Sequence, residues 1–209
     1  MPLSPAGAQL TFAFEEAYWA RGILRVAGVD EAGRGPLAGP VVAAAVVFLE
    51  PVAFPGLNDS KKLSVQRRAD LHERLISHPQ VLWATGVREA EEIDRLNILR
   101  ATHAAMGEAL GKLGGVHHAL VDGLPVPGLS VTHDALVGGD ARCASIAAAS
   151  IIAKVVRDKM MDGWHEHFPQ YGFHRHRGYP THAHLTQLRL HGPSPIHRRS
   201  FAPVAAALR

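Results

Sequence analysis

Four acidic side chains of this chain have the type and placement of metal ligands. Asp30 and Glu31 directly follow an apolar segment, and Asp122 ends a second apolar segment. Asp140 follows two glycines and precedes a segment rich in alanine and serine. Because strand ends commonly carry site residues in α/β proteins, these acids are candidates for one functional site.

Clustered carboxylates repel one another unless a cation neutralises them. Carboxylate oxygens are hard ligands that suit Mg²⁺ or Mn²⁺ rather than zinc. Two such ions about 4 Å apart can bind both the attacking and the leaving oxygen of a phosphodiester displacement. If the four acids meet in space, the chemistry expected is metal-dependent hydrolysis of a phosphodiester.

Each acid also has a purely structural interpretation. Asp30 and Glu31 could form a polar turn, and Asp122 precedes a glycine, which is a turn signal. Asp140 could cap a helix. Adjacent strand residues point to opposite faces. Asp30 and Glu31 would therefore reach one spot only if the strand broke at the following glycines, or if Glu31 took a second ligand position.

Histidines raise an alternative metal hypothesis, a zinc site. The pairs are His174 with His176 and His182 with His184. No cysteine partner or HExxH pattern accompanies them, and the second pair lies two residues apart on a predicted helix, so its members would not share a face. The single cysteine, Cys143, is interpreted as a small buried hydrophobic residue. Zinc is therefore the weaker metal hypothesis.

Composition indicates one compact domain over residues 1–209. Hydrophobic residues make up 47% of the chain, which is enough for a sizeable core. Residues 165–199 hold more than ten histidines and arginines but one acid, Glu166. Such a region is either a solvated surface or one that contacts phosphate. The formal charge of +3 and the pI of about 9.3 are compatible with a polyanionic partner.

The sequence favours a cytoplasmic protein. Residues 1–10 lack a basic stretch followed by an apolar one, so no secretory signal is expected. The longest apolar run, residues 41–49, is far shorter than the roughly 20 residues of a membrane-spanning helix, and its valines indicate a buried strand. One cysteine allows no disulfide within the chain, as is usual in a reducing compartment.

Hydrophobic periodicity predicts an α/β architecture with a mixed sheet flanked by helices. Strands are expected over residues 23–29, 41–49, 81–87 and 118–122, and around Val131. The first two, joined by a Gly/Pro-rich link, should be neighbours. Helices are expected over residues 64–77 with Ser64 as the N-cap, and over 90–113, 141–168 and 181–191. Residues 1–20 would form a leader, and about 165–209 a small helical appendage.

Five ordered motifs resemble those of the bacterial ribonuclease HII family. They are residues 29–41 (VDEAGRGPLAGPV), 59–64 (DSKKLS), 139–141 with 145–154 (GDA and SIAAASIIAK), 178–181 (GYPT) and 192–201 (GPSPIHRRSF). The resemblance extends from about residue 25 to 204. It implies an RNase H-like fold with a C-terminal helical part.

The resemblance also implies the site residues. Asp30, Glu31, Asp122 and Asp140 would be the four catalytic, metal-binding carboxylates. Asp134 competes for the fourth position, and the Gly-Asp-Ala context favours Asp140.

The Gly-Arg-Gly segment of the family recognises the ribose 2′-OH at an RNA–DNA junction, and it corresponds to Gly33, Arg34 and Gly35. Glycines let the backbone approach a sugar closely, and the 2′-OH distinguishes RNA from DNA. The matching tyrosine is Tyr179, which would pack on the sugar at the deoxynucleotide side; its alternative is a core aromatic with a satisfied hydroxyl. Either Lys61 or Lys62 could contact phosphate or be a solvated surface lysine.

The activity implied is that of an endonuclease using two Mg²⁺ or Mn²⁺ ions. It would cut 5′ of a ribonucleotide in RNA–DNA hybrids and at single ribonucleotides in duplex DNA, leaving 5′-phosphate and 3′-hydroxyl ends. Its partners would be these nucleic acids, its role ribonucleotide removal, and its state a monomer. One rival is a ribonuclease HIII-like enzyme, which lacks the Gly-Arg-Gly signature and has an N-terminal domain for which the expected leader is too short. The other is a non-catalytic nucleic-acid-binding protein.

Overall fold

A five-stranded sheet with the order β3-β2-β1-β4-β5 forms the centre of the molecule. The computed structural model describes residues 10–208, so the first part of the expected leader lies outside the described residues. The strands are β1 (Val26–Ala32), β2 (Val41–Phe48), β3 (Val81–Arg88), β4 (His118–Asp122) and β5 (His133–Leu136). The helices are α1 (Ala13–Trp19), α2 (Val65–Ser77), α3 (Ala90–Leu96), α4 (Ile98–Leu113), α5 (Ala144–His167), α6 (Phe173–His176), α7 (His182–His191) and α8 (Ala202–Ala206).

The register of the sheet brings two acids to the same end. β1 pairs antiparallel with β2, as β2 does with β3, whereas β1 and β4 are parallel, as are β4 and β5. The predicted proximity of the first two strands is thus confirmed. Val29 lies opposite Val121 across the parallel pair. The following residues, Asp30 and Asp122, therefore reach the C-terminal ends of neighbouring parallel strands.

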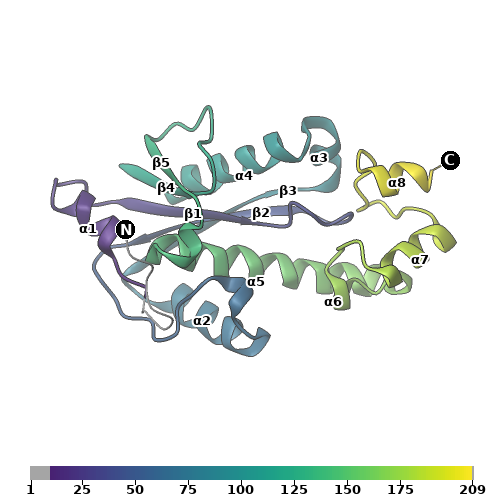
Figure 1. The fold of residues 1–209 in the computed structure, drawn as a ribbon, viewed down its shortest axis with the longest axis horizontal. Coiled ribbons are helices and arrows are strands. Elements are labelled where there is room, and N and C mark those ends of the chain that lie inside the picture. Colours follow the sequence, from purple (N-terminus) through teal and green to yellow (C-terminus); the bar gives the residue numbers. More distant parts are fainter. Residues whose placement is uncertain (1–9, 209) are drawn as a thin grey trace.

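Helices cover both faces of the sheet (Figure 1). α4 packs on one face against β1 and β2, and α2 and α5 pack on the other. All of β2 is buried, as expected of a strand covered on both sides. Helix α5 approaches β1 so closely that a Cβ atom at Gly28 would overlap the backbone of Ser145. This contact fixes the start of α5, and the turn before it, against the central strand.

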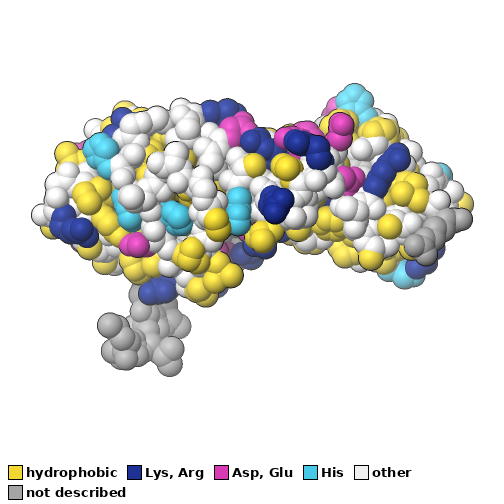
Figure 2. Space-filling view, turned by 90° about the horizontal axis from the view of Figure 1, so that it is seen from above, with side chains coloured by type: hydrophobic (Ala, Val, Ile, Leu, Met, Phe, Trp, Pro, Cys, Tyr) yellow, Lys and Arg dark blue, Asp and Glu magenta, His cyan; other side chains and the backbone are white. Residues whose placement is uncertain are grey.

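The helices α6, α7 and α8 lie beyond one end of the sheet (Figure 1). One apolar core joins α6 to α5 and to the loop before β2, and its buried members are Ala38, Met161, Tyr171, Phe173 and Ile196. A second one joins α7 and α8 to the same loop through Leu37, Leu188 and Val204. The molecule is narrower between the sheet and these helices, and acidic and basic side chains lie next to one another on the face seen in Figure 2. The C-terminal helices are thereby tied to the 33–40 loop.

Three predicted elements are wrong in their bounds. The strand expected over residues 23–29 is β1, which runs from Val26 to Ala32 and so includes Asp30 and Glu31. The single helix expected over residues 90–113 is divided into α3 and α4 at Asn97, whose φ of 69° lies in the left-handed region. The Asn97 side chain accepts a hydrogen bond of 3.0 Å from the Arg100 amide and so caps α4. The strand expected around Val131 begins at His133 instead.

Other local predictions are confirmed. Ser64 caps α2 by accepting a hydrogen bond of 3.3 Å from the Arg67 amide. The apolar run at residues 41–49 forms the buried strand β2. Within the described residues, no helix has both the length and the apolar character needed to cross a membrane.

Candidate active site

Three aspartates from separate elements meet at one end of the sheet. Asp30 lies in β1, Asp122 ends β4, and Asp140 lies in the short 3₁₀-helix Gly139–Ala141 before α5. Each offers a carboxylate oxygen, and these oxygens lie within 4.8 Å of one another. The structure thus brings together three of the four predicted acids in an arrangement that could hold a metal ion.

Hydrogen bonds fix the orientation of this trio. The Asp122 carboxylate accepts a bond of 2.7 Å from the amide of Gly139, which ties the end of β4 to the turn that carries Asp140. A Cβ atom at Gly139 would lie 2.5 Å from Cδ1 of Ile146, so a larger residue there would have to displace the Ile146 side chain. The Asp30 carboxylate accepts a bond of 2.7 Å from the Glu31 amide.

The other two acids considered from the sequence have different surroundings. Glu31 lines the same cavity as Asp30 but forms an ion pair with Arg34, with an N–O distance of 3.3 Å. Asp134 lies in β5, where it accepts a hydrogen bond from Tyr18 and pairs with His118. The geometry places Asp140, and not Asp134, beside Asp30.

Burial and the charges of neighbouring carboxylates favour the protonated forms of three acids, Asp30, Glu31 and Asp140. Asp30 is 5% exposed, and its desolvation, together with the charges of Glu31 and Asp122, raises its pKa well above the usual value. Burial also raises the pKa of Glu31 although Arg34 opposes the shift. The pKa of Asp140 is raised by burial and by Asp59 and Asp122. A cation bound among them would offset this repulsion.

Lys61 is the cation that the chain places beside Asp140. Its ammonium group lies 3.4 Å from the Asp140 carboxylate. Although partial burial lowers the pKa of Lys61, nearby carboxylates led by Asp140 raise it overall. The turn that carries Lys61 is capped by the Asp59 side chain. Lys62 is exposed and does not line the cavity, so the two lysines have different surroundings.

A cavity of about 250 Å³ joins the acids to the predicted recognition residues. Its lining includes Asp30, Glu31, Gly33, Arg34, Gly35, Lys61, Asp122 and Tyr179. Tyr179 is 44% exposed, so the interpretation as a core aromatic is wrong. A Cβ atom at Gly35 would lie 3.5 Å from the Tyr179 ring, which places the ring beside the glycine segment.

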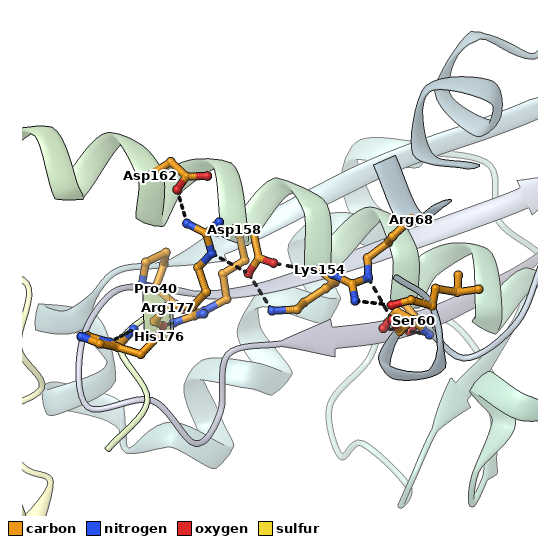
Figure 3. A network of polar contacts seen from close by, with 12 residues as sticks. Pro40, Ser60, Arg68, Lys154, Asp158, Asp162, His176 and Arg177 are labelled. Carbon is orange, nitrogen blue, oxygen red and sulfur yellow. Dashed lines mark hydrogen bonds and ion pairs between the residues drawn. The ribbon is translucent and has the colours of Figure 1, made fainter. Parts of the chain in front are cut away.

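The cavity also contains α5 side chains that the sequence interpretation missed. Ser150, Lys154 and Arg157 all line it. Their spacing of four and three residues puts them on one helix face, and this spacing could have identified them. Lys154 donates a hydrogen bond of 2.7 Å to Asp158, which also pairs with Arg68 of α2 (Figure 3). Asp158 thus connects α5 to the helix that follows the Lys61 turn.

The histidines considered for zinc form no group of three ligand atoms close enough to hold an ion within the described residues. His176 hydrogen-bonds to the carbonyl of Tyr171 at 2.8 Å, and His184 to the ring of His197 at 3.0 Å. Within residues 10–208, the three aspartates are the one group of at least three potential ligands that the geometry brings together. Cys143 is buried, as interpreted, and its thiol donates to Glu15.

Comparison with known proteins gives consistent matches. The family model described as ribonuclease HII matches residues 27–204. The ribonuclease HII of Dechloromonas aromatica (strain RCB) is 55% identical over 184 residues, covering 88% of this chain and 93% of that relative. The crystal structure of the ribonuclease H2 from Pyrococcus horikoshii OT3 is similar with a TM-score of 0.73 and 28% identity, covering 87% of this chain and 96% of that one.

A more distant match concerns the fold alone. The crystal structure of Bst-RNase HIII in complex with Mn²⁺ has a TM-score of 0.63 and 18% identity, covering 89% of this chain and 70% of that one. Together these structures confirm the expected RNase H-like fold, with its mixed sheet and flanking helices.

Proposed function

Because the chain belongs to the ribonuclease HII family and is a ribonuclease H, we propose that it hydrolyses the phosphodiester 5′ of a ribonucleotide. Its substrates are RNA–DNA hybrids and duplex DNA with single embedded ribonucleotides. One observation carries the proposal: the aspartate trio, the 33–35 segment and Tyr179 line or border the same cavity. The groups for cleavage and those for choosing a sugar are therefore within reach of one nucleotide.

The acids of this site fit Mg²⁺ or Mn²⁺. Their oxygens are hard ligands, and burial together with mutual repulsion makes the uncompensated cluster unfavourable. Asp30, Asp122 and Asp140 would hold such ions, with Glu31 at the edge of the set. When bound, two ions supply a nucleophile at neutral pH and stabilise the charge that develops on the leaving oxygen.

Recognition is proposed to reside in the glycine segment and Tyr179. Gly33 has a φ of +100°, and a Cβ atom there would overlap Arg157, so glycine lets the segment lie directly against α5. Gly35 is exposed and lines the cavity, so its backbone can approach a ribose 2′-OH. The exposed Tyr179 ring offers a flat surface for the neighbouring sugar. Lys61 is suited to a phosphate, since its side chain is 77% exposed and its ammonium group lies beside Asp140.

Cleavage of defined duplexes tests this proposal. We expect a DNA duplex with one ribonucleotide to be cut on its 5′ side, leaving a 5′-phosphate and a 3′-hydroxyl, and the all-DNA duplex to stay intact. End-labelled strands separated beside sequence ladders report the position and the end groups. Cleavage confined to runs of several ribonucleotides would instead support a ribonuclease HIII-like specificity.

A further inference from the structure

Two buried arginines lie behind the recognition segment without being part of its surface motif. Arg157 of α5 is 1% exposed and Arg198, in the segment before α8, is 0% exposed. Burial lowers their pKa values to about 10 and about 9 respectively, so both remain protonated at neutral pH. A buried cation is costly unless its donors are satisfied, and here the acceptors are backbone carbonyls.

Arg198 holds the loop that begins with the recognition segment. Its guanidinium group donates five hydrogen bonds of 2.6–3.1 Å, and their acceptors are the carbonyls of Gly33, Arg34, Pro36, Gly39 and Pro40. Its backbone amide donates to Leu37 at 2.8 Å. The planar fork of a guanidinium suits such divergent acceptors, whereas a lysine ammonium does not have this geometry.

Arg157 connects the same loop to the turn that carries Tyr179. It donates to the carbonyls of Pro40 and Ala38 at 2.9 and 3.2 Å, and to that of Arg177 at 3.1 Å. Figure 3 shows Arg177, from the same turn, directed toward Asp158 on α5. Arg177 has a left-handed φ of 52°, a conformation that costs free energy outside glycine and persists only where its surroundings impose it.

Direct backbone contact joins the two segments as well. The amide of Leu37 donates to the carbonyl of Gly178 at 2.8 Å. A Cβ atom at Gly178 would lie 2.5 Å from the Ala38 carbonyl, so the chain just before Tyr179 lies against the loop. A shift in either segment would therefore change the spacing between the glycines and the Tyr179 ring.

The two arginines donate hydrogen bonds to almost every backbone carbonyl of the 33–40 loop. Seven of the eight carbonyls from residue 33 to residue 40 accept a hydrogen bond from Arg157 or Arg198, and those seven belong to Gly33, Arg34, Pro36, Leu37, Ala38, Gly39 and Pro40. Gly35 is the exception in this stretch, and it is the residue that lies beside the Tyr179 ring. The two arginines thus hold the loop through its other carbonyls, and Gly35, which lines the cavity, accepts from neither of them.

We propose that Arg157 and Arg198 are positioning residues that set the spacing between the 33–35 segment and Tyr179, and thereby the selectivity for a ribonucleotide flanked by DNA. The inference rests on the proposed function of the same cavity. Neither arginine is assigned a contact with substrate. Because misplacement by about 1 Å can cost on the order of 10²-fold in rate, loosening the loop should affect the more demanding substrate first.

The test compares two substrates for each variant. The ratio of kcat/KM on a single-ribonucleotide duplex to kcat/KM on a continuous RNA–DNA hybrid is measured for Arg157→Met, Arg198→Met and the two Arg→Lys variants. We expect the ratio to fall about tenfold or more with methionine, with lysine failing to restore it. If a methionine variant does not fold, the corresponding lysine variant decides, since it keeps the charge.

Arg88→Met is the matched control. Arg88 also donates to backbone carbonyls, those of Val87 and Ala104, and pairs with Glu108, but it lies on the edge strand β3. For Arg88→Met, the ratio of kcat/KM on the two substrates should match that of the wild type even if the melting temperature of the variant falls.

Three results would overturn the inference. An equal loss on both substrates would indicate a merely structural role, and full restoration by lysine would show that the fork is unnecessary. If the wild type cut the hybrid but never the single ribonucleotide, the proposed function itself would be wrong and the inference with it.

Discussion

Two clusters of buried titratable side chains, acids at the cavity and histidines in the C-terminal part, both have pKa values shifted toward the neutral form but differ in their hydrogen-bond partners. The acids Asp30 and Asp140 have raised pKa values because of burial and neighbouring carboxylates. In the C-terminal part, His184 of α7 and His197 in the segment before α8 have pKa values lowered to about 4 and about 3, mainly by burial and, for His197, by His184. Crowding of like groups alone therefore does not separate a functional cluster from a structural one.

The hydrogen-bond partners separate them. The His184 ring bonds to the carbonyl of Tyr179 at 2.9 Å and to the His197 ring at 3.0 Å, and His197 accepts from the Ser194 amide at 3.0 Å. A neutral imidazole has one donor and one acceptor, so these contacts satisfy it. Ionised carboxylates only accept, and the acid cluster contains more acceptors than neighbouring donors. The hydrogen-bonding groups of the two histidine rings are therefore satisfied within the protein, whereas the acid cluster needs a cation to balance its charge.

The largest effect expected is on the acid cluster. Asp140→Asn removes one charged ligand and should lower cleavage by about 10²–10³-fold or more, while nucleic-acid binding is retained. Rates on the single-ribonucleotide duplex and binding by fluorescence anisotropy report the two properties. Asp134→Asn is the matched control, because Asp134 lies outside the trio in β5. Equal losses in both variants would refute the assignment of Asp140.

A second effect should appear in acid unfolding. His184 and His197 have folded-state pKa values below the unfolded value of about 6.5, so the unfolded chain takes up protons as the pH falls. Their contribution is fully present above pH 6.5 and is lost as the pH falls toward 4. Each histidine should reduce the unfolding free energy by up to about 1.4 kcal/mol per pH unit in this window.

Urea unfolding at pH 7 and pH 5 measures this loss. His184→Gln should be less stable at pH 7 but should lose less stability between the two pH values than the wild type. Carboxylates titrate in both proteins, so the difference between them isolates the histidine. The same loss in both proteins would show that the cluster does not resist protonation.

The acids could be found from the sequence because they follow clear strand signals. Residues 29–31 and 119–122 combine an apolar strand with an acid at its end, and the parallel register of β1 and β4 then brings Asp30 and Asp122 together. That register, and the turn at Gly139 that directs Asp140 toward Asp122, depend on packing of α5 and are not written in local periodicity. The motif resemblance supplied what periodicity could not.

Unlike the acids, the arginines behind the loop could not be identified from the sequence. Arg198 lies 158 to 165 residues from its carbonyl acceptors, and no local pattern reports such contacts. A basic stretch in the sequence suggested solvent or phosphate, yet Arg198 is buried against backbone. The division of residues 90–113 at Asn97 has a local cause instead, since Asn97 adopts a left-handed φ of 69° and caps α4 with its own side chain, and asparagine favours both roles.

The smallest effect is expected at Lys61, the basic side chain at the edge of the acid cluster. The histidine cluster does not need such a charged neighbour because its rings are neutral. Lys61→Ala should raise KM by about tenfold and leave kcat less affected, because one phosphate contact is lost. Loss of this contact should also reduce the slope of log affinity against log salt by about one unit. Lys62→Ala is the control from the same turn, since Lys62 does not line the cavity. Binding titrations at several salt concentrations give the slope of log affinity against log salt. Equal slopes for both variants would show that the position beside Asp140 is irrelevant. A reduced slope for Lys61→Ala alone would show that its ammonium group contacts the nucleic acid.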